Sequence, residues 1–214
     1  MKKRIYLVRH AESESNAGGI LGGEKTPLSE QGLTQAQFIA KRASNLPIDI
    51  IISSSMFRAQ QTAQCIADTI GKPIGAISDL FVERRHPSAQ LGLTEKHPEA
   101  VRLEEIINSN FGKDGFRHSD EENFEDLKAR ALQALAYLEE REEQNILLVT
   151  HGMFLRVLMA VVLYGEGLTG HEASKLFYGF KTQNTGLSIF EKNPNDRMRS
   201  GWRIFVWNDH AHLG

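Results

Sequence analysis

The chain has 214 residues, 41% of them hydrophobic and 24% charged, which is an ordinary composition for a globular protein with a core of its own. A formal net charge of −2 gives no electrostatic reason to expect a nucleic-acid partner. The one cysteine, Cys65, excludes an intrachain disulfide and a cysteine-based metal cluster. The longest apolar stretch, residues 153–163, contains Arg156 and is too short to span a membrane. These features favour a cytoplasmic enzyme.

The first predicted element is a strand over residues 5–8, where four apolar residues are typical of a central strand in a parallel sheet. The chain then becomes polar at once, with Arg9, His10, Ser13 and Asn16. A buried strand that ends in such a cluster delivers side chains to the edge of a sheet, where open α/β folds bind ligands. We interpret His10 as a nucleophile for phosphoryl transfer and Arg9 as a clamp for the phosphoryl anion.

Two helices and a second strand are predicted next. Four glycines within residues 18–23 indicate a loop, after which Ser29 is a good N-cap for a helix. Residues 48–52 form an apolar strand, and the serines at 53–55 can cap the helix that follows. Arg58 then falls in the first turn of that helix, where free backbone N–H groups and the helix dipole favour an anion.

The middle of the chain is less regular. Residues 74–77 predict a short strand, but from residue 79 to about residue 123 prolines and glycines interrupt every pattern except a short helix near 99–107. We interpret residues 84–123, approximately, as an insertion that covers the site and carries specificity within a single domain spanning 1–214. Ser119 and Glu122 match a capping box for the next helix.

The last part of the chain returns to regular patterns. A long helix with an apolar face over residues 127–138 leads to a strand at 146–149, which ends in Thr150-His151-Gly152. A helix at 153–164 is apolar nearly all round, and two strands are predicted at 186–191 and 203–207. Strands that alternate with helices predict a three-layer α/β sandwich, with a mostly parallel central sheet covered by helices on both faces.

Parallel strands place their carboxyl ends along one edge of a sheet, so His10, the segment 53–58 and His151 are expected to converge. Hydrolysis of a phosphate monoester needs charge neutralisation, a nucleophile, and an acid for the leaving oxygen. Arginine suits the first task because its planar fork pairs with two phosphate oxygens. Histidine attacks phosphorus only as neutral imidazole, and nearby arginines disfavour the imidazolium form.

Four blocks of the sequence point to one family by their order. They are Arg-His-Ala-Glu-Ser at residues 9–13, Thr-Pro-Leu-Ser-Glu-Gln-Gly at 26–32, Ser-Ser-Ser at 53–55 with Arg58, and Val-Thr-His-Gly at 149–152. Together they resemble the histidine phosphatase superfamily, which includes the cofactor-dependent phosphoglycerate mutases. Asn-Thr-Gly at 184–186 is similar to a later strand start of that family.

The resemblance implies a role for each matching residue. His10 would form the phosphohistidine, and Glu83 matches the family's proton donor, with Asp79 as its nearest rival. The residues that would hold the phosphoryl group are Arg9, Arg58 and His151, with Asn16 assisting. The family needs no metal, so the resemblance implies no metal and no other cofactor, and its substrate would be a small phosphorylated metabolite.

Three further residues have two interpretations each. Arg84 and Arg85 either contact the distal part of the substrate or belong to a basic surface run. Ser13 either donates a hydrogen bond to the substrate or caps a turn.

The sequence departs from the family pattern at two places. Ala11 stands where the family has glycine. If the family uses that glycine for a positive φ, alanine would cost stability; if the family uses it only for close approach, the added methyl group would narrow the pocket. After Glu83 the chain lacks the Glu-Gly segment with which the mutases hold phosphoglycerate. We therefore favour a metal-independent phosphomonoesterase, with a phosphoglycerate mutase or a non-catalytic phosphate-ligand binder as alternatives.

Overall fold

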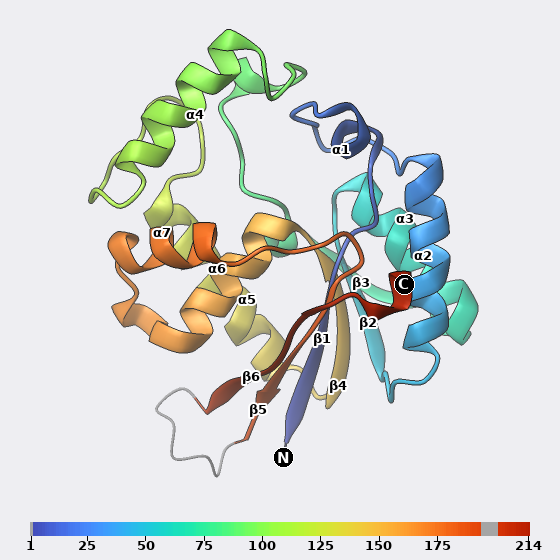
Figure 1. Cartoon of the computed structure of the whole chain (residues 1–214). Coiled ribbons are helices and arrows are strands. Elements are labelled where there is room, and N and C mark those ends of the chain that lie inside the picture. The colour runs from blue at the N-terminus through green and yellow to red at the C-terminus, as the bar shows by residue number, and fades with distance from the viewer. Residues whose placement is uncertain (1, 194–200) are drawn as a thin grey trace.

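One sheet of six strands forms the centre of the computed structural model, which describes residues 2–193 and 201–214 (Figure 1). The strands are β1 (Lys3–Arg9), β2 (Ile50–Ser54), β3 (Ile74–Ser78), β4 (Asn145–Thr150), β5 (Leu187–Lys192) and β6 (Trp202–Asp209). Their order is β3-β2-β4-β1-β5-β6, in which the first four are parallel. β5 runs antiparallel to β1, and β6 runs antiparallel to β5. The prediction of a mostly parallel sheet is confirmed.

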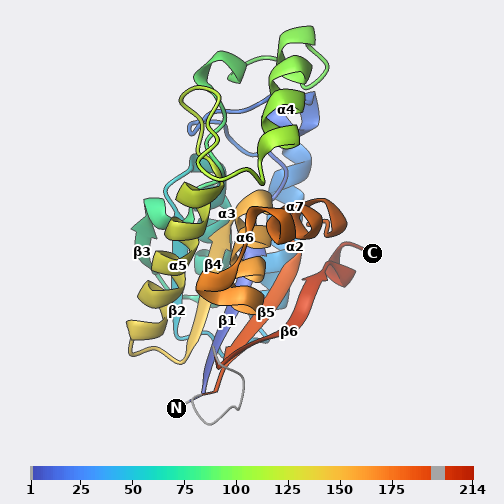
Figure 2. The ribbon, with the colours of Figure 1, turned by 90° about the vertical axis from the view of Figure 1, so that its left-hand side faces the viewer.

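Helices cover both faces of this sheet, as Figures 1 and 2 show. They are α1 (Glu14–Gly18), α2 (Glu30–Ala43), α3 (Phe57–Ile70), α4 (Pro98–Asn110), α5 (Phe124–Glu140), α6 (Gly152–Tyr164) and α7 (Gly170–Gly179). α2 and α3 lie on one face, and α5, α6 and α7 lie on the other. The predicted three-layer α/β sandwich is confirmed. α4, drawn in green, stands beyond the carboxyl ends of the parallel strands.

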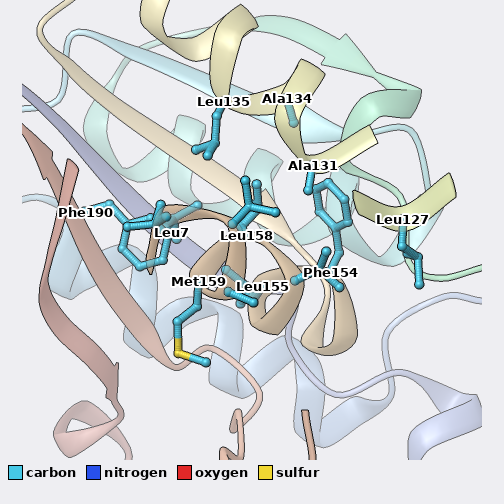
Figure 3. Close-up of a cluster of buried hydrophobic side chains, with 14 of the residues drawn as sticks. Leu7, Leu127, Ala131, Ala134, Leu135, Phe154, Leu155, Leu158, Met159 and Phe190 are labelled. Atoms are coloured by element: carbon cyan, nitrogen blue, oxygen red, sulfur yellow. The ribbon is translucent and has the colours of Figure 1, made fainter. Parts of the chain in front are cut away.

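The larger core lies around α6. This helix contacts α5, α7 and the sheet, which is why its sequence is apolar nearly all round. Figure 3 shows Phe154, Leu155, Leu158 and Met159 of α6 packed among residues of α5 and of the strands. Each fully buried side chain of this size contributes about 1.5–3 kcal/mol. The first residues of α6, which contribute to the site described below, are therefore held in place by this packing.

Two of the predicted helix caps differ from those observed. Ser29 caps α2 as predicted, but the N-cap of α3 is Met56, whose N–H donates to the Ser54 hydroxyl. The predicted capping box of Ser119 and Glu122 is wrong, because Asn123 caps α5 in a reciprocal pair with its third helical residue. Glu122 is instead buried against the guanidinium of Arg130, with Nη2 to Oε2 at 2.7 Å, so its carboxylate is engaged elsewhere.

Two helices were not anticipated. α1 has only five residues and begins at the capping box of Ser13 and Asn16. α7 begins at a capping box of Thr169 and Glu172, a Thr-x-x-Glu signal that was present in the sequence. Among the described residues, no helix is both long and apolar enough to cross a bilayer.

Candidate active site

The three central strands end side by side. β4 lies between β1 and β2, with Arg9 opposite Thr150 and Ser53 opposite Val149. His10 and His151 follow directly after β1 and β4, and their ring centroids are 4.9 Å apart. The sheet order thus brings together segments that are far apart in the sequence.

The imidazole of His10 is held as a neutral ring. Its Nδ1 lies 2.7 Å from the carbonyl oxygen of Ala11, and because a carbonyl only accepts, Nδ1 carries the proton. Nε2 is then an acceptor, and the Nε–H of Arg58 donates to it at 3.2 Å. Burial lowers the pKa of His10 well below its ordinary value, and the charges of Arg58 and Arg9 lower it further. A neutral ring with a free electron pair on Nε2 can act as a nucleophile.

Arg58 is fixed by contacts at each nitrogen. It lies in the first turn of α3, as predicted, and besides His10 it donates to the Gly23 carbonyl at 3.0 Å and to the Met56 sulfur at 3.1 Å. Its guanidinium therefore stands beside Nε2 of His10 without an acidic partner in hydrogen-bond contact among the described residues. Such a cation is free to pair with an anionic ligand.

His151 has a buried ring nitrogen without a partner. Its Nε2 lies 2.8 Å from the hydroxyl of Ser54, and either atom of this pair can be the donor, depending on the tautomer of the ring. Nδ1 is buried with no hydrogen-bond partner among the described residues, and it is a donor in the tautomer in which Ser54 donates to Nε2. Burial, followed by the neighbouring His10, lowers the pKa of His151 well below its ordinary value. A buried donor without a partner is costly unless a ligand oxygen accepts from it.

Glu83 sits at the amino end of α6. Its Oε1 accepts from the N–H groups of Arg84 and Phe154, each at 3.0 Å, and its Oε2 accepts from the N–H of Met153 at 3.1 Å. Burial by itself raises the pKa of this carboxyl, but the backbone donors lower it, Met153 foremost. The charges of Arg58 and Arg9 act in the same direction, so the pKa of Glu83 lies below its ordinary value.

Arg9 lies against Gly152, the first residue of α6. Its Nη1 donates to the carbonyl of Thr182 at 2.7 Å, whereas its Nε is buried and has no partner among the described residues. A Cβ on Gly152 would stand 3.2 Å from that Nε, so glycine allows the guanidinium to pack on the helix start. Arg9 and Glu83 also line a small cavity of about 300 Å³, to which Arg156 and Lys181 add positive charge.

A larger cavity of about 940 Å³ opens onto these groups. Its walls include Arg9, His10, Arg58 and Glu83, together with the loop at 20–27 and the segment at 83–95. Of the remaining predicted site residues, the lining includes Asn16, Arg84 and Arg85. The segment proposed as an insertion therefore supplies one wall of the cavity.

Ser13 does not line this cavity, and its side chain is fully buried. The hydroxyl accepts from the N–H of Asn16 at 3.2 Å and lies 3.0 Å from the hydroxyl of Ser15. These contacts favour the interpretation of Ser13 as a cap over that of a substrate contact.

Ala11 is accommodated without strain. It is not among the described residues with positive φ, so its backbone does not require glycine. Its methyl group is fully buried against Leu28 and Ala36, and Ala11 is not among the residues that line the large cavity. The backbone strain expected of a residue larger than glycine is therefore absent, and the methyl group forms no part of the cavity wall.

The segments that carry these site residues also match a known protein family. A family model described as the histidine phosphatase superfamily (branch 1) matches residues 5–210. The chain belongs to this superfamily. Within the residues that the structure covers, no group of three or more His, Cys, Asp and Glu side chains is arranged to hold a metal ion.

Relatives extend this membership over nearly the whole chain. A probable phosphoglycerate mutase GpmB of Enterobacter sp. (strain 638) is 32% identical over 219 residues, covering 98% of this chain and 94% of the relative. The protein of that name from Yersinia pestis (strain Pestoides F) is 33% identical with the same coverage.

Two phosphatase structures share the fold. A mycobacterial glucosyl-3-phosphoglycerate phosphatase is 24% identical, with a TM-score of 0.78 over 96% of this chain and 98% of that chain. A phosphoserine phosphatase from Entamoeba histolytica is 24% identical, with a TM-score of 0.77 over 99% of this chain and 100% of that chain. At this identity the likeness concerns the fold alone.

Sequence reasoning missed several groups that shape this superfamily site. Asn184 donates its side-chain N–H to the carbonyl of His10 at 3.0 Å, and the N–H of Thr185 donates to the carbonyl of Arg9 at 3.0 Å. The Asn-Thr-Gly block at 184–186 was a signal for them, but we assigned it only to the start of a strand. The backbone donors to Glu83 at the start of α6 left no trace in the pattern of residue types.

Proposed function

We propose that this protein hydrolyses phosphate monoesters through a phosphohistidine formed on Nε2 of His10. The observation that carries the proposal is the state of that nitrogen. It is unprotonated, it is held by Arg58 at 3.2 Å, and it belongs to a residue that lines a cavity large enough for a small metabolite. Membership of the superfamily supports the same chemistry.

The first half of the reaction transfers the phosphoryl group. Nε2 of His10 attacks phosphorus, the bond to the leaving oxygen breaks, and that oxygen takes a proton from Glu83. The phosphoryl oxygens accept hydrogen bonds from Arg9, Arg58 and Nδ1 of His151, with Asn16 nearby. A phosphate dianion beside Glu83 raises the pKa of the Glu83 carboxyl. Glu83 therefore takes up a proton when the substrate binds, although it holds none in the free enzyme.

The second half reverses the role of the carboxyl. The Glu83 carboxylate takes a proton from water, the water oxygen attacks phosphorus, and the bond between nitrogen and phosphorus breaks. Inorganic phosphate leaves and His10 returns to its neutral state. The three backbone donors hold both carboxylate oxygens in place through both steps.

The decisive experiment replaces the nucleophile. His10→Ala should abolish hydrolysis of p-nitrophenyl phosphate. Mass spectrometry on samples kept at neutral to alkaline pH, where the N–P bond survives, should detect phosphorylated His10 in the wild type and no phosphorylated intermediate in the variant. The matched control is His171→Ala, because His171 is an exposed residue of α7 that lines neither cavity. Unchanged turnover by His10→Ala would sink the mechanism, and phosphate binding without turnover by the wild-type protein would favour a non-catalytic binder.

The acid has its own test. Glu83→Gln should slow hydrolysis by about 100- to 10,000-fold, which is the usual contribution of general acid–base catalysis. Wild-type rates in that variant near neutral pH would place the acid elsewhere, with Asp79 as the next candidate.

A phosphoglycerate mutase is the second candidate, because the curated relatives carry that name with the word "probable". Incubation with 3-phosphoglycerate and a trace of 2,3-bisphosphoglycerate distinguishes the two activities. Release of inorganic phosphate supports the phosphatase, whereas formation of 2-phosphoglycerate without phosphate release supports the mutase.

Arg84 is the residue that we propose for contact with the leaving-group end of the substrate. It is only 6% exposed, its Cζ lies 4.8 Å from the ring centroid of Phe111, and its Nε has no hydrogen-bond partner among the described residues. A buried guanidinium without an ion pair is costly, and an anionic group on the substrate would offset that cost. Arg85 is more exposed and lies 3.9 Å from Glu122, so it should contribute less.

The test compares two substrates and two variants. Arg84→Met should raise KM about 10- to 150-fold for 3-phosphoglycerate or phosphoserine, which carry a second anionic group, and leave KM for p-nitrophenyl phosphate nearly unchanged. Arg85→Met is the control. An equal rise of KM for all three substrates would contradict the assignment of Arg84 to the distal end.

A further inference from the structure

The segment that carries Arg9 and His10 is tied to the carboxyl-terminal end of the chain. The link passes through Thr185, a buried residue with φ of 57°. A β-branched residue rarely adopts this left-handed conformation, and it persists only where surrounding contacts hold it. Here the N–H of Thr185 donates to the carbonyl of Arg9, at the end of β1. The strained residue therefore supports the backbone from which the nucleophile projects.

The hydrogen bonds of the Thr185 hydroxyl show which groups hold this residue in place. Oγ1 donates to the carbonyl of Asn184 at 2.7 Å, which uses its only hydrogen. The contact of 3.0 Å between this oxygen and Nε2 of His212 is then one in which the imidazole donates. Nδ1 of His212 is left as an acceptor, and Nη1 of Arg42 donates to it at 3.2 Å. Arg42 is in turn paired with the carboxylate of Asp209.

These contacts join three parts of the fold. His212 lies in the short 3₁₀ turn Ala211–Leu213, which packs on α2, and Arg42 belongs to α2. Figure 1 shows the carboxyl terminus resting beside that helix. Asn208 adds a second tie, because its Oδ1 accepts from the N–H of Gln183 at 2.7 Å, two residues before Thr185.

We propose that His212 is a positioning residue for the reaction assigned to His10, acting through the hydroxyl of Thr185 on the backbone of Arg9 and His10. His212 lies in the turn that packs on α2, and both of its ring nitrogens are engaged by Thr185 and Arg42, so we assign it no contact with the substrate. The inference rests on the proposed function for its kinetic consequence, whereas the tie itself is independent of any activity.

Three variants test the proposal. His212→Leu removes the donor to Thr185 and keeps an apolar body of similar size. His212→Gln keeps an amide donor that can reach the same oxygen. His210→Leu is the matched control, because His210 is an exposed histidine in the same tail whose ring, within the described part of the chain, bonds only to the carbonyl of Asn208, at 2.9 Å.

We expect His212→Leu to lower kcat about 5- to 30-fold, with KM changed less than about twofold, since small misplacement of a reacting group affects the chemical step. His212→Gln should recover most of kcat, and His210→Leu should match the wild type. In parallel, hydrogen exchange measured by mass spectrometry should become faster over residues 183–187 in His212→Leu alone.

Several results would overturn the proposal. Unchanged exchange over residues 183–187 in His212→Leu would show that the tail does not hold Thr185. Faster exchange with unchanged kcat, or equal losses of kcat in the leucine and glutamine variants, would show that the tie is a purely structural contact. Absence of turnover by the wild-type protein would instead reject the proposed function, and the exchange comparison would still decide whether the tie exists.

Discussion

Gly152→Ala is a sharp test of how Arg9 is held. Gly152 is not among the residues with positive φ, so alanine is compatible with its backbone. The added Cβ would, however, stand 2.8 Å from Thr182 Oγ1, 3.2 Å from Arg9 Nε and 3.4 Å from its Cζ. Thr182 can rotate its side chain, whereas Arg9 must shift by a few tenths of an ångström.

The expected cost follows from the role proposed for Arg9 as a phosphoryl clamp. Displacement of a catalytic group by about 1 Å costs about 100-fold in rate, so a shift of a few tenths of an ångström should lower kcat/KM about 3- to 10-fold. This corresponds to about 0.6–1.4 kcal/mol of transition-state stabilisation. The assay is hydrolysis of p-nitrophenyl phosphate, with urea unfolding of the same samples to show that the free energy of unfolding has not fallen.

Two comparisons isolate the cause. Gly179→Ala is the control, because a Cβ at Gly179, the last residue of α7, would meet no atom within 4 Å. The double variant Gly152→Ala with Thr182→Ala removes the shortest contact and leaves the one with Arg9. Full recovery of kcat/KM in the double variant, or an undiminished kcat/KM in Gly152→Ala itself, would refute the reasoning about Arg9.

Three other predictions concern pH and stability. The lowered pKa of Glu83 leaves its carboxyl ionised in the free enzyme, so kcat/KM should fall as pH rises from 5 to 8. A flat wild-type profile, or the same fall in Glu83→Gln, would contradict this prediction. The lowered pKa values of His10 and His151 mean that their stabilising contribution is complete above about pH 6.5 and is lost as pH falls, by at most about 1.4 kcal/mol per pH unit for each ring. Urea unfolding at pH 7 and pH 5 should therefore show a smaller loss for His10→Gln than for the wild type, and equal losses would argue against a buried neutral His10. Arg130→Met should destabilise the protein by up to about 3–5 kcal/mol, because the buried Glu122 carboxylate then keeps only the exposed Arg85, at 3.9 Å, as a cationic partner among the described residues, whereas Arg102→Met, at an exposed pair, should leave the free energy of unfolding nearly unchanged in the same assay.

Much of the fold was predictable because its signals are local. The apolar run at 5–8 and the polar residues after it identified β1 and His10, and the serine at 29 located the start of α2. The position of Arg58 in the first turn of α3 followed from helix periodicity alone. The predicted box at Ser119 was wrong because the competing local pair Asn123 and Asp126 forms the capping box of α5, while Glu122 pairs with Arg130.

The sequence by itself determined which residue types end the strands, and therefore that His10, Arg58 and His151 would meet at one edge. Periodicity is enough for this, since parallel strands put their carboxyl ends together. Only the tertiary structure decided how each group is held. The carboxylate of Glu83 binds backbone N–H groups about 70 positions later in the chain, and Thr185 contacts His212, 27 positions later near the carboxyl terminus. Such contacts depend on where folded elements come to lie, and backbone donors look the same in every residue, so neither leaves a mark in the order of amino acids.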